Sequence, residues 1–181
     1  MASIILWGPP GVGKTTIARL LADQIRLQFV QISAIFTGVS ELRKVFEEAR
    51  LRHRTGSGTL LFVDEIHRFN KAQQDALLPW VESGRIILLG ATTENPSFSV
   101  NRALLSRLQV MVLKSLQTED LEALVSRALE APQGLAGEIS ADDKVVTRIA
   151  QLADGDARRA LGLLEQAATL AEDGQLTLNA V

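Results

Sequence analysis

The sequence predicts an α/β fold in which a parallel five-stranded sheet lies between two layers of helices, followed by a small all-helical lid. Five short runs rich in isoleucine, leucine and valine carry the first part of this prediction; they occupy residues 4–6, 29–32, 60–63, 86–89 and 110–113. These runs are apolar on both faces and alternate with helical patterns, which is typical of buried parallel strands. Beyond residue 114 the patterns are helical, so we expect an α/β core at residues 1–114 and a lid at 115–181.

The helices of the core are expected between these strands. Residues 15–27 carry apolar side chains on one face. Ser40 has the character of an N-cap for a second helix that continues towards His53. A third helix is expected at residues 70–82, although Pro79 should bend it or end it early.

Three helices are expected in the lid. The first begins at Thr118, and Ser140 with Asp143 resembles a capping box before the second. Gly155 then separates the second from the third. The apolar stripe of the third helix, expected to face inward, comprises Ala157, Ala160, Leu161, Leu164 and Ala168.

Length and composition limit the possible classes of protein. The chain has 181 residues, enough for one substantial domain with a small appendage. It has no cysteine, which excludes a disulfide framework and thiolate metal ligands and fits a reducing cytoplasm. A formal net charge of −2 does not by itself indicate nucleic acid. No run approaches the roughly 18 apolar residues that cross a bilayer, so we expect no membrane partner.

The stretch GPPGVGKT directly follows the first predicted strand and opens the first helix. It fits the pattern G-x-x-x-x-G-K-[ST], in which backbone N–H groups point at phosphate. Lys14 would reach the β and γ oxygens of a nucleotide, and Thr15 would offer its hydroxyl to Mg²⁺; the alternative is a purely structural turn. The predicted nucleotide-binding residues are Gly8, Pro9, Pro10, Gly11, Val12, Gly13, Lys14, Thr15 and Thr16.

The stretch LLFVDEIH ends a predicted buried strand in two carboxylates. Beside a phosphate loop, Asp64 is expected to hold Mg²⁺ together with Thr15. Glu65 is then placed to orient or deprotonate an attacking water. The alternative is a solvated strand end. His67 lacks a second ligand at metal-site spacing, so we interpret it as a polar surface or hinge residue.

The stretch GATTENPSF follows the fourth predicted strand. If this strand lies beside the one that ends in Asp64, its end reaches the terminal phosphate, and Thr92, Thr93 or Asn95 could sense that phosphate by hydrogen bonding. Formation of a turn before Pro96 is the alternative. The sequence does not decide between the two threonines.

Two arginines are candidates for contact with the terminal phosphate. Arg107 precedes the last strand and could reach a nucleotide bound by a neighbouring subunit, as an arginine finger; a surface ion pair is the alternative. Arg158, with Arg159, lies in the first turn of the last helix and could touch the phosphate within one chain. A plain surface position explains Arg158 equally well.

Taken in order, these motifs resemble those of AAA+ ATPases. More specifically, the chain resembles the replication-associated recombination protein A family, which includes the eukaryotic Werner helicase interacting protein. The resemblance covers nearly the whole chain. Its most specific pieces are HRFNKAQQDALLP and GATTENPSF, since clamp-loader subunits and the RuvB motor share only the general ATPase motifs.

The resemblance implies roles for the residues already named. It implies a Walker A motif at residues 8–15, a Walker B motif at Asp64 and Glu65, and a first sensor at Thr92 or Thr93. Arg107 would be the arginine finger and Arg158 a second sensor.

The resemblance also implies ATP and Mg²⁺ as cofactors and DNA-stimulated ATP hydrolysis at stalled replication forks. The implied partners are DNA junctions, single-strand binding protein and further copies of the chain, in the bacterial cytoplasm near the nucleoid. A clamp-loader-like ATP switch or a RuvB-like branch-migration subunit is the alternative function. A small-molecule kinase is disfavoured by the placing of Glu65 beside Asp64.

Two departures from the family pattern carry further expectations. The chain begins close to its first strand, without the preceding segment that packs on adenine in these ATPases, so we expect weak or base-indifferent nucleotide binding. It ends after the lid, without the family's oligomerisation domain, so we expect a monomer or weak dimer. Candidate DNA-contacting or pore-facing positions, with a solvated helix face as the alternative, are Arg68, Asn70, Lys71 and Gln73.

Overall fold

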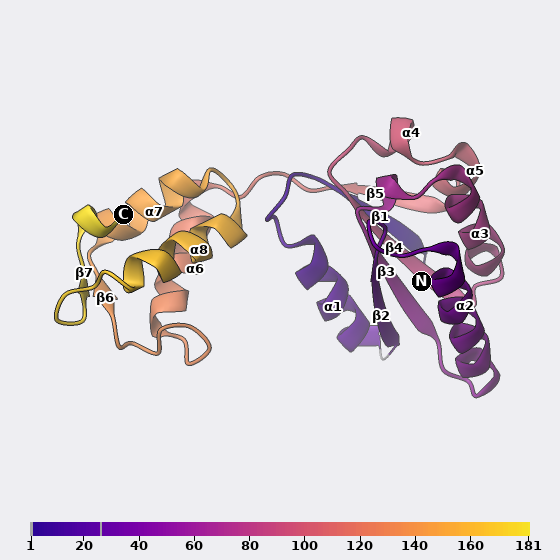
Figure 1. The fold of residues 1–181 in the computed structure, drawn as a ribbon, viewed down its shortest axis with the longest axis horizontal. Helices are drawn as coiled ribbons and strands as arrows, with labels where there is room; N and C mark the ends of the chain where they lie inside the picture. The colour runs from indigo at the N-terminus through magenta and orange to yellow at the C-terminus, as the bar shows by residue number, and fades with distance from the viewer. Residues whose placement is uncertain (1, 26) are drawn as a thin grey trace. The chain divides into compact units, whose positions relative to one another are not determined.

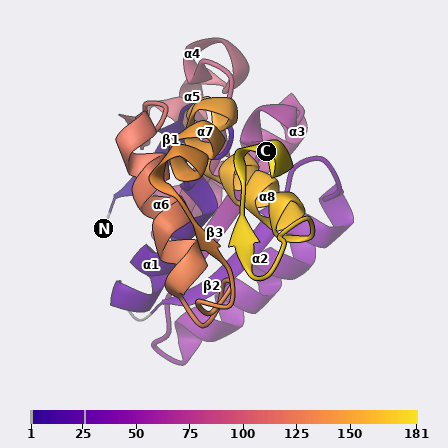
Figure 2. The same cartoon turned by 90° about the vertical axis from the view of Figure 1, so that its left-hand side faces the viewer.

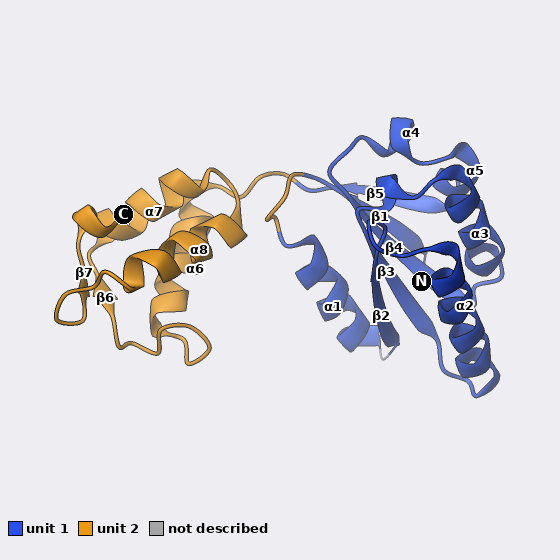
Figure 3. Cartoon of the chain, in the orientation of Figure 1, with its two compact units in different colours: residues 1–8, 13–113 blue, residues 9–12, 114–181 orange. Residues whose placement is uncertain are grey.

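The computed structural model describes residues 2–25 and 27–181, and the chain divides into two compact units (Figure 3). Unit 1 comprises residues 1–8 and 13–113, and unit 2 comprises residues 9–12 and 114–181. The change after Leu113 adjoins the boundary expected between residues 114 and 115. Residues 9–12 were expected in the core but group with the helical unit, where the N–H of Ala157 donates to the carbonyl of Gly11 at 3.1 Å.

A parallel sheet forms the centre of unit 1 (Figure 1). The described strands are β1 (Ser3–Trp7), β2 (Gln28–Ser33), β3 (Thr59–Asp64), β4 (Ile86–Thr92) and β5 (Leu108–Val112). Their order across the sheet is β2-β3-β4-β1-β5, and all neighbouring pairs are parallel. Each predicted apolar run is a strand, and the expected pairing of β3 with β4 is confirmed.

Helices cover both faces of this sheet. Those of unit 1 are α1 (Lys14–Ile25), α2 (Val39–Arg54), the 3₁₀ helix η1 (Ile66–Arg68), α3 (Lys71–Glu82), α4 (Pro96–Ser99) and α5 (Arg102–Leu105). Figure 1 shows α1 on one side and α2 and α3 on the other. Along β3, Leu61 and Val63 pack in the core with α2 and α3, whereas Leu60 and Phe62 pack with α1. This alternation, with a period of two residues, confirms the three-layer α/β fold.

The strand β5 differs from the prediction because it is not buried. Val110, Met111 and Val112 expose 40%, 46% and 62% of their surface. In the described sheet β5 is an edge strand that pairs with β1 alone. Its apolar composition therefore marks a strand correctly but overstates its burial.

Two predicted helix boundaries in unit 1 are wrong. Ser40 lies inside α2, whose N-cap is Gly38 and has no side-chain capping bond. Pro79 does not end α3 early, since the helix continues to Glu82. An interior proline costs about 3 kcal/mol, but the residues around it pack in the core, where the rings of Trp80 and Phe46 stack with centroids 4.9 Å apart.

Unit 2 is helical, as expected. It contains α6 (Thr118–Glu130), α7 (Asp143–Ala153), α8 (Ala157–Ala168) and the 3₁₀ helix η2 (Leu178–Ala180). The three long helices enclose an apolar core that includes Val125, Ile149 and Leu164, and Figure 2 shows them from a second side. A short parallel pair of strands, β6 (Ser140–Ala141) and β7 (Gln175–Leu176), was not predicted. Ser140 thus belongs to a strand, and the N-cap of α7 is Asp142.

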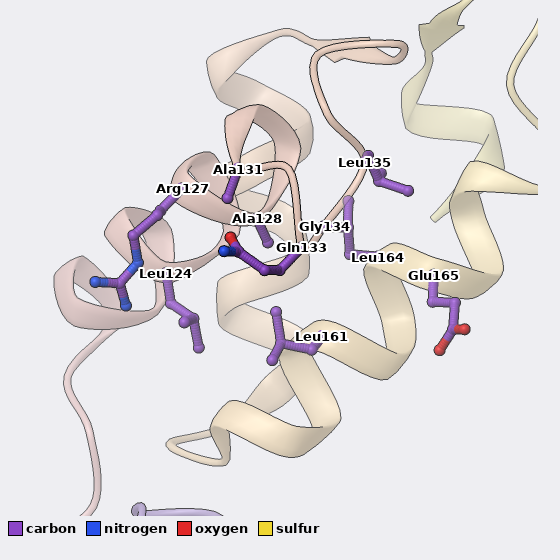
Figure 4. A pocket seen from close by; sticks show the side chains of 10 residues that line it. All are labelled: Leu124, Arg127, Ala128, Ala131, Gln133, Gly134, Leu135, Leu161, Leu164 and Glu165. Carbon is purple, nitrogen blue, oxygen red and sulfur yellow. The ribbon is translucent and has the colours of Figure 1, made fainter. Parts of the chain in front are cut away.

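One residue of the expected inward stripe in α8, Leu161, is exposed rather than buried. Leu161 is 39% exposed and faces a pocket of about 470 Å³ with Leu124 and Leu164 (Figure 4). None of the residues that line this pocket belongs to the predicted site. In the part of the chain that the structure describes, no helix is both long enough and apolar enough to cross a membrane.

Candidate functional site

The carboxyl ends of β1, β3 and β4 bring the main predicted residues to one edge of the sheet. Trp7 of β1 is paired with Thr92 of β4, and Val63 of β3 is paired with Gly90. Neighbouring parallel strands end at the same edge, which is where ligands of such sheets bind. Gly8, Asp64 and Thr92 therefore lie at adjacent strand ends.

Lys14 is tied to these strand ends by hydrogen bonds. It is the first residue of α1 and only 8% exposed. Its Nζ donates to the carbonyl of Gly8 at 2.8 Å, and the N–H of Gly8 donates to the carbonyl of Thr92 at 3.2 Å. The lysine of the predicted phosphate loop and the predicted sensor strand are thus linked through one residue.

The rest of the predicted loop is divided between the two units. Gly11 and Gly13 have φ of 70° and 89°, in the left-handed region that favours glycine. Thr15, which is partly buried, and Thr16, which is exposed, continue α1 in unit 1. The remaining residues of the segment 9–12, which belong to unit 2, are Pro9, Pro10 and Val12.

The two predicted carboxylates occupy a tight turn. Asp64 ends β3, and its Oδ1 accepts a hydrogen bond from the N–H of Glu65 at 3.1 Å. Glu65 has φ 54° and ψ 43°, a left-handed conformation that is uncommon for residues other than glycine. Such backbone strain concentrates at functional sites. Glu65 then caps η1, in which the next polar residue is His67.

His67 is a member of the site that the sequence did not predict. Its side chain is 3% exposed, and its Nε2 lies 3.2 Å from Oε2 of Glu65. Its Nδ1 lies 2.9 Å from Oγ1 of Thr92. The interpretation of His67 as a surface residue is therefore wrong, and a hinge role stays a prediction. The three-residue turn of η1 has no periodic pattern, and the only available signal was a histidine two residues after a carboxylate.

The two threonines after β4 have different surroundings. Thr92 is fully buried, and its Oγ1 accepts from the N–H of Glu94 at 3.0 Å and lies 3.2 Å from the carbonyl of Glu94. Thr93 is exposed. Asn95 caps α4, where its side-chain oxygen accepts from the N–H of Ser97 at 3.0 Å. The turn-forming alternative thus describes Asn95 well.

Arg107 lies at the opposite edge of the sheet. Its Nε donates to Oε1 of Glu82 at 2.6 Å, which is the surface ion pair of the alternative. It lines a hollow with Ser3 and Ile86, the first residues of β1 and β4. Strands of this length, at about 3.3 Å per residue, separate the two edges by roughly 20 Å. The structure therefore does not bring Arg107 to Lys14 of the same chain.

The remaining candidates have mixed surroundings. Arg158 is exposed in the first turn of α8, in unit 2, where Asp156 is the N-cap and accepts from the N–H of Arg159 at 3.0 Å. Arg68 and Lys71 are exposed in unit 1.

Asn70 and Gln73, in contrast, have structural partners. They form the capping box of α3, and the Nε2 of Gln73 donates to the carbonyl of Thr37 at 3.0 Å. Gln73 is only 9% exposed, so the expectation that it contacts DNA or faces a pore is wrong.

Comparison with known proteins decides the family. Residues 4–116 match the ATPase family associated with various cellular activities (AAA). The chain belongs to this family. Residues 132–177 of the same chain match the Cdc6 AAA+ ATPase-type lid domain, a range that includes α7 and α8.

The AAA domain and its lid have curated relatives in bacteria and eukaryotes. Replication-associated recombination protein A of Escherichia coli K12 is 52% identical over 172 residues, covering 94% of this chain and 38% of the relative. ATPase WRNIP1 of Dictyostelium discoideum is 47% identical over 168 residues, covering 92% of this chain and 19% of the relative. The chain thus spans well under half the length of these relatives.

Solved structures share the fold. The Thermotoga maritima RuvB Holliday junction branch migration motor has a TM-score of 0.79 with this chain, at 24% identity, covering 99% of this chain and 59% of RuvB. At that level of identity the likeness is one of fold alone.

Proposed function

We propose that this AAA domain binds ATP at the carboxyl edge of its sheet and hydrolyses it. The observation that carries the proposal is a continuous series of contacts from Lys14 through Gly8, Thr92 and His67 to Glu65. It joins a phosphate-binding lysine to a carboxylate suited to general-base catalysis across three adjacent strand ends. A simple structural turn after β1 would not require these contacts.

The residues at this edge have the chemistry that ATP hydrolysis needs. Backbone N–H groups of the loop after Pro10, from Gly11 to Thr15, and the side chain of Lys14 are suited to binding phosphate. Thr15 and Asp64 offer the hard oxygen ligands that suit Mg²⁺, which when bound neutralises charge on the phosphates. Glu65 accepts the proton of the attacking water.

We assign the sensing of the terminal phosphate to Thr93 rather than Thr92. A hydroxyl has one hydrogen to donate and two lone pairs to accept. The contacts of Thr92 with His67 and the backbone of Glu94 use this capacity. Thr93 is exposed one residue further along, so its hydroxyl is free to meet a ligand.

The two arginines are proposed to complete the site, Arg107 from unit 1 of a neighbouring copy and Arg158 from unit 2 of the same chain. Arg107 is too far from the site of its own chain and would serve a neighbouring copy. Arg158 would act from unit 2, with residues 115–181 as a lid that responds to the terminal phosphate. This division of labour requires an assembly of several copies.

The wider role is carried over from the relatives as a proposal. The relative from Escherichia coli is named for replication-associated recombination, and we propose DNA-stimulated hydrolysis at stalled forks, with DNA junctions and single-strand binding protein as partners. Arg68 and Lys71 are exposed cations beside the site, suited to phosphate contacts with DNA. To test these two residues, DNA-stimulated ATP turnover is measured at several salt concentrations. Removing either cation should weaken the dependence of this stimulation on salt.

The test of the proposed function is ATP turnover by the intact protein with single-stranded, duplex and forked DNA. We expect turnover that rises with DNA and is abolished in Lys14→Ala. Turnover that persists in Lys14→Ala would contradict the site. Nucleotide binding without any turnover would favour a clamp-loader-like switch.

A further inference from the structure

We propose that His67 is a positioning residue, which holds the carboxylate of Glu65 where the attacking water is deprotonated. The inference rests on the proposed ATPase function and goes beyond it, because none of the roles assigned above requires a histidine. A buried imidazole with polar partners at both ring nitrogens is a specific arrangement. Here those partners are Glu65, from the end of β3, and Thr92, from the end of β4.

The contacts assign the proton of the ring. The Nε2 of His67 lies 3.2 Å from Oε2 of Glu65, and because an ionised carboxylate can only accept, we assign the ring hydrogen to Nε2. Nδ1 faces the hydroxyl of Thr92 at 2.9 Å, and a hydroxyl can serve as donor or acceptor there. The ring therefore has one orientation, with Thr92 as its anchor and Glu65 as the group that it holds.

The anchor is rigid and the held group is flexible. Thr92 is fully buried and ends β4, which lies between β3 and β1 in the sheet. A glutamate side chain has several rotatable bonds, and without a partner it populates several rotamers. A displacement of about 1 Å at a reacting group can lower the rate by about 100-fold. His67, fixed by Thr92 at the end of β4, thus restricts the carboxylate of Glu65 to one position.

A second carboxylate near the ring is a weak competitor. Oε1 of Glu94 lies 3.6 Å from Nε2 of His67, beyond hydrogen-bonding distance. Its side chain is 59% exposed, whereas that of Glu65 is 27% exposed. Water screens the more exposed group, so the interaction with Glu65 dominates.

The test uses three variants of the intact protein that separate the two ring nitrogens. His67→Gln keeps an amide donor near the position of Nε2, and His67→Asn keeps a polar group only on the Thr92 side. His67→Ala removes both. We expect kcat to fall about 10- to 100-fold in the Asn and Ala variants and to stay within about threefold in the Gln variant. The dissociation constant for ATP should change less than about threefold in all three, since none of them touches phosphate.

A double variant provides a second readout. If His67 acts through Glu65, adding His67→Ala to Glu65→Gln should lower kcat no further. Equal losses in the Gln, Asn and Ala variants, with a lowered melting temperature, would assign His67 a purely structural role and overturn the inference. Wild-type kcat in the folded Asn variant would overturn the inference about His67 but leave the proposed function intact. Absence of turnover in the wild-type protein would overturn both.

Discussion

The two ends of the parallel strands, called here the carboxyl edge and the amino edge of the sheet, differ in how many of their predicted site residues contact one another within one chain. At the carboxyl edge, Lys14 and Glu65 are connected by contacts within one chain. At the amino edge, Arg107 is held by Glu82 and has no part in that network. A single chain therefore positions Lys14 and Glu65, the proposed phosphate ligand and base, by its own contacts, whereas Arg107, the proposed arginine finger, lies where only another copy could use it.

The largest expected effect tests whether the amino edge serves a neighbour. In an assembled protein, Arg107→Ala should lower kcat by about 10³-fold or more, as loss of an arginine finger does. Mixing Arg107→Ala with Lys14→Ala subunits should restore part of the turnover, because the intact site of one subunit meets the intact arginine of the other. ATPase assays of the mixtures measure this. Arg102→Ala, which removes another exposed arginine from the segment before β5, is the matched control.

If the wild-type assembly is active but no mixture of Arg107→Ala and Lys14→Ala subunits recovers turnover, Arg107 does not act across subunits. The ion pair with Glu82 would then be its whole role. The comparison between the two edges would survive as a difference of structure but not of function.

The next effect concerns the carboxyl edge. Glu65→Gln should lower kcat by about 10²- to 10⁴-fold, because the water loses its base. ATP binding should persist, since Lys14 and the loop remain. Equilibrium binding of a fluorescent ATP analogue, measured beside turnover, checks both halves. Unchanged turnover would remove Glu65 from the mechanism and leave the left-handed turn without a catalytic purpose.

The same contrast explains what could be predicted from the sequence. The strands of unit 1 were predictable because buried parallel strands are continuous apolar runs. The position of Asp64 at a strand end was predictable because it directly follows such a run, and Lys14 belongs to a motif that begins right after the first one; the roles of both residues stay predictions. The burial of β5 was not predictable, since its composition is that of a central strand and only the sheet order makes it an edge. His67 was missed because its partner Thr92 lies 25 residues further along the chain, at the end of another strand.

Helix ends were predicted less well than helices, for a similar reason. Ser40 and Ser140 have side chains that can cap a helix, but a cap forms only where the backbone leaves the helical conformation. In the structure those points are Gly38 and Asp142. Pro79 stays within α3 because tertiary packing outweighs its local cost.

A smaller effect separates the two threonines. Thr93→Val should lower kcat by about 10- to 100-fold through the loss of one hydrogen bond to a charged group, with the free energy of unfolding changed by less than about 0.5 kcal/mol. Thr92→Val leaves buried polar partners unsatisfied and should lower the free energy of unfolding by about 1–3 kcal/mol. Denaturant titration beside turnover measures both. If turnover falls in Thr92→Val and stays at the wild-type level in Thr93→Val, Thr92 is the sensor instead.

The smallest effect concerns the ion pair itself. Glu82→Gln removes the charged partner of Arg107. The side chain of Arg107 is 40% exposed and that of Glu82 is 48% exposed. Exposed pairs contribute about 0–1 kcal/mol, so the free energy of unfolding should fall by less than about 1 kcal/mol, and less again at high salt. The same variant frees the guanidinium without altering it, so turnover of the assembled protein should stay within about threefold of wild type. A loss of turnover as large as that of Arg107→Ala would mean that Glu82 aims the arginine at the neighbouring site, and the amino edge would then be preorganised for catalysis just as the carboxyl edge is.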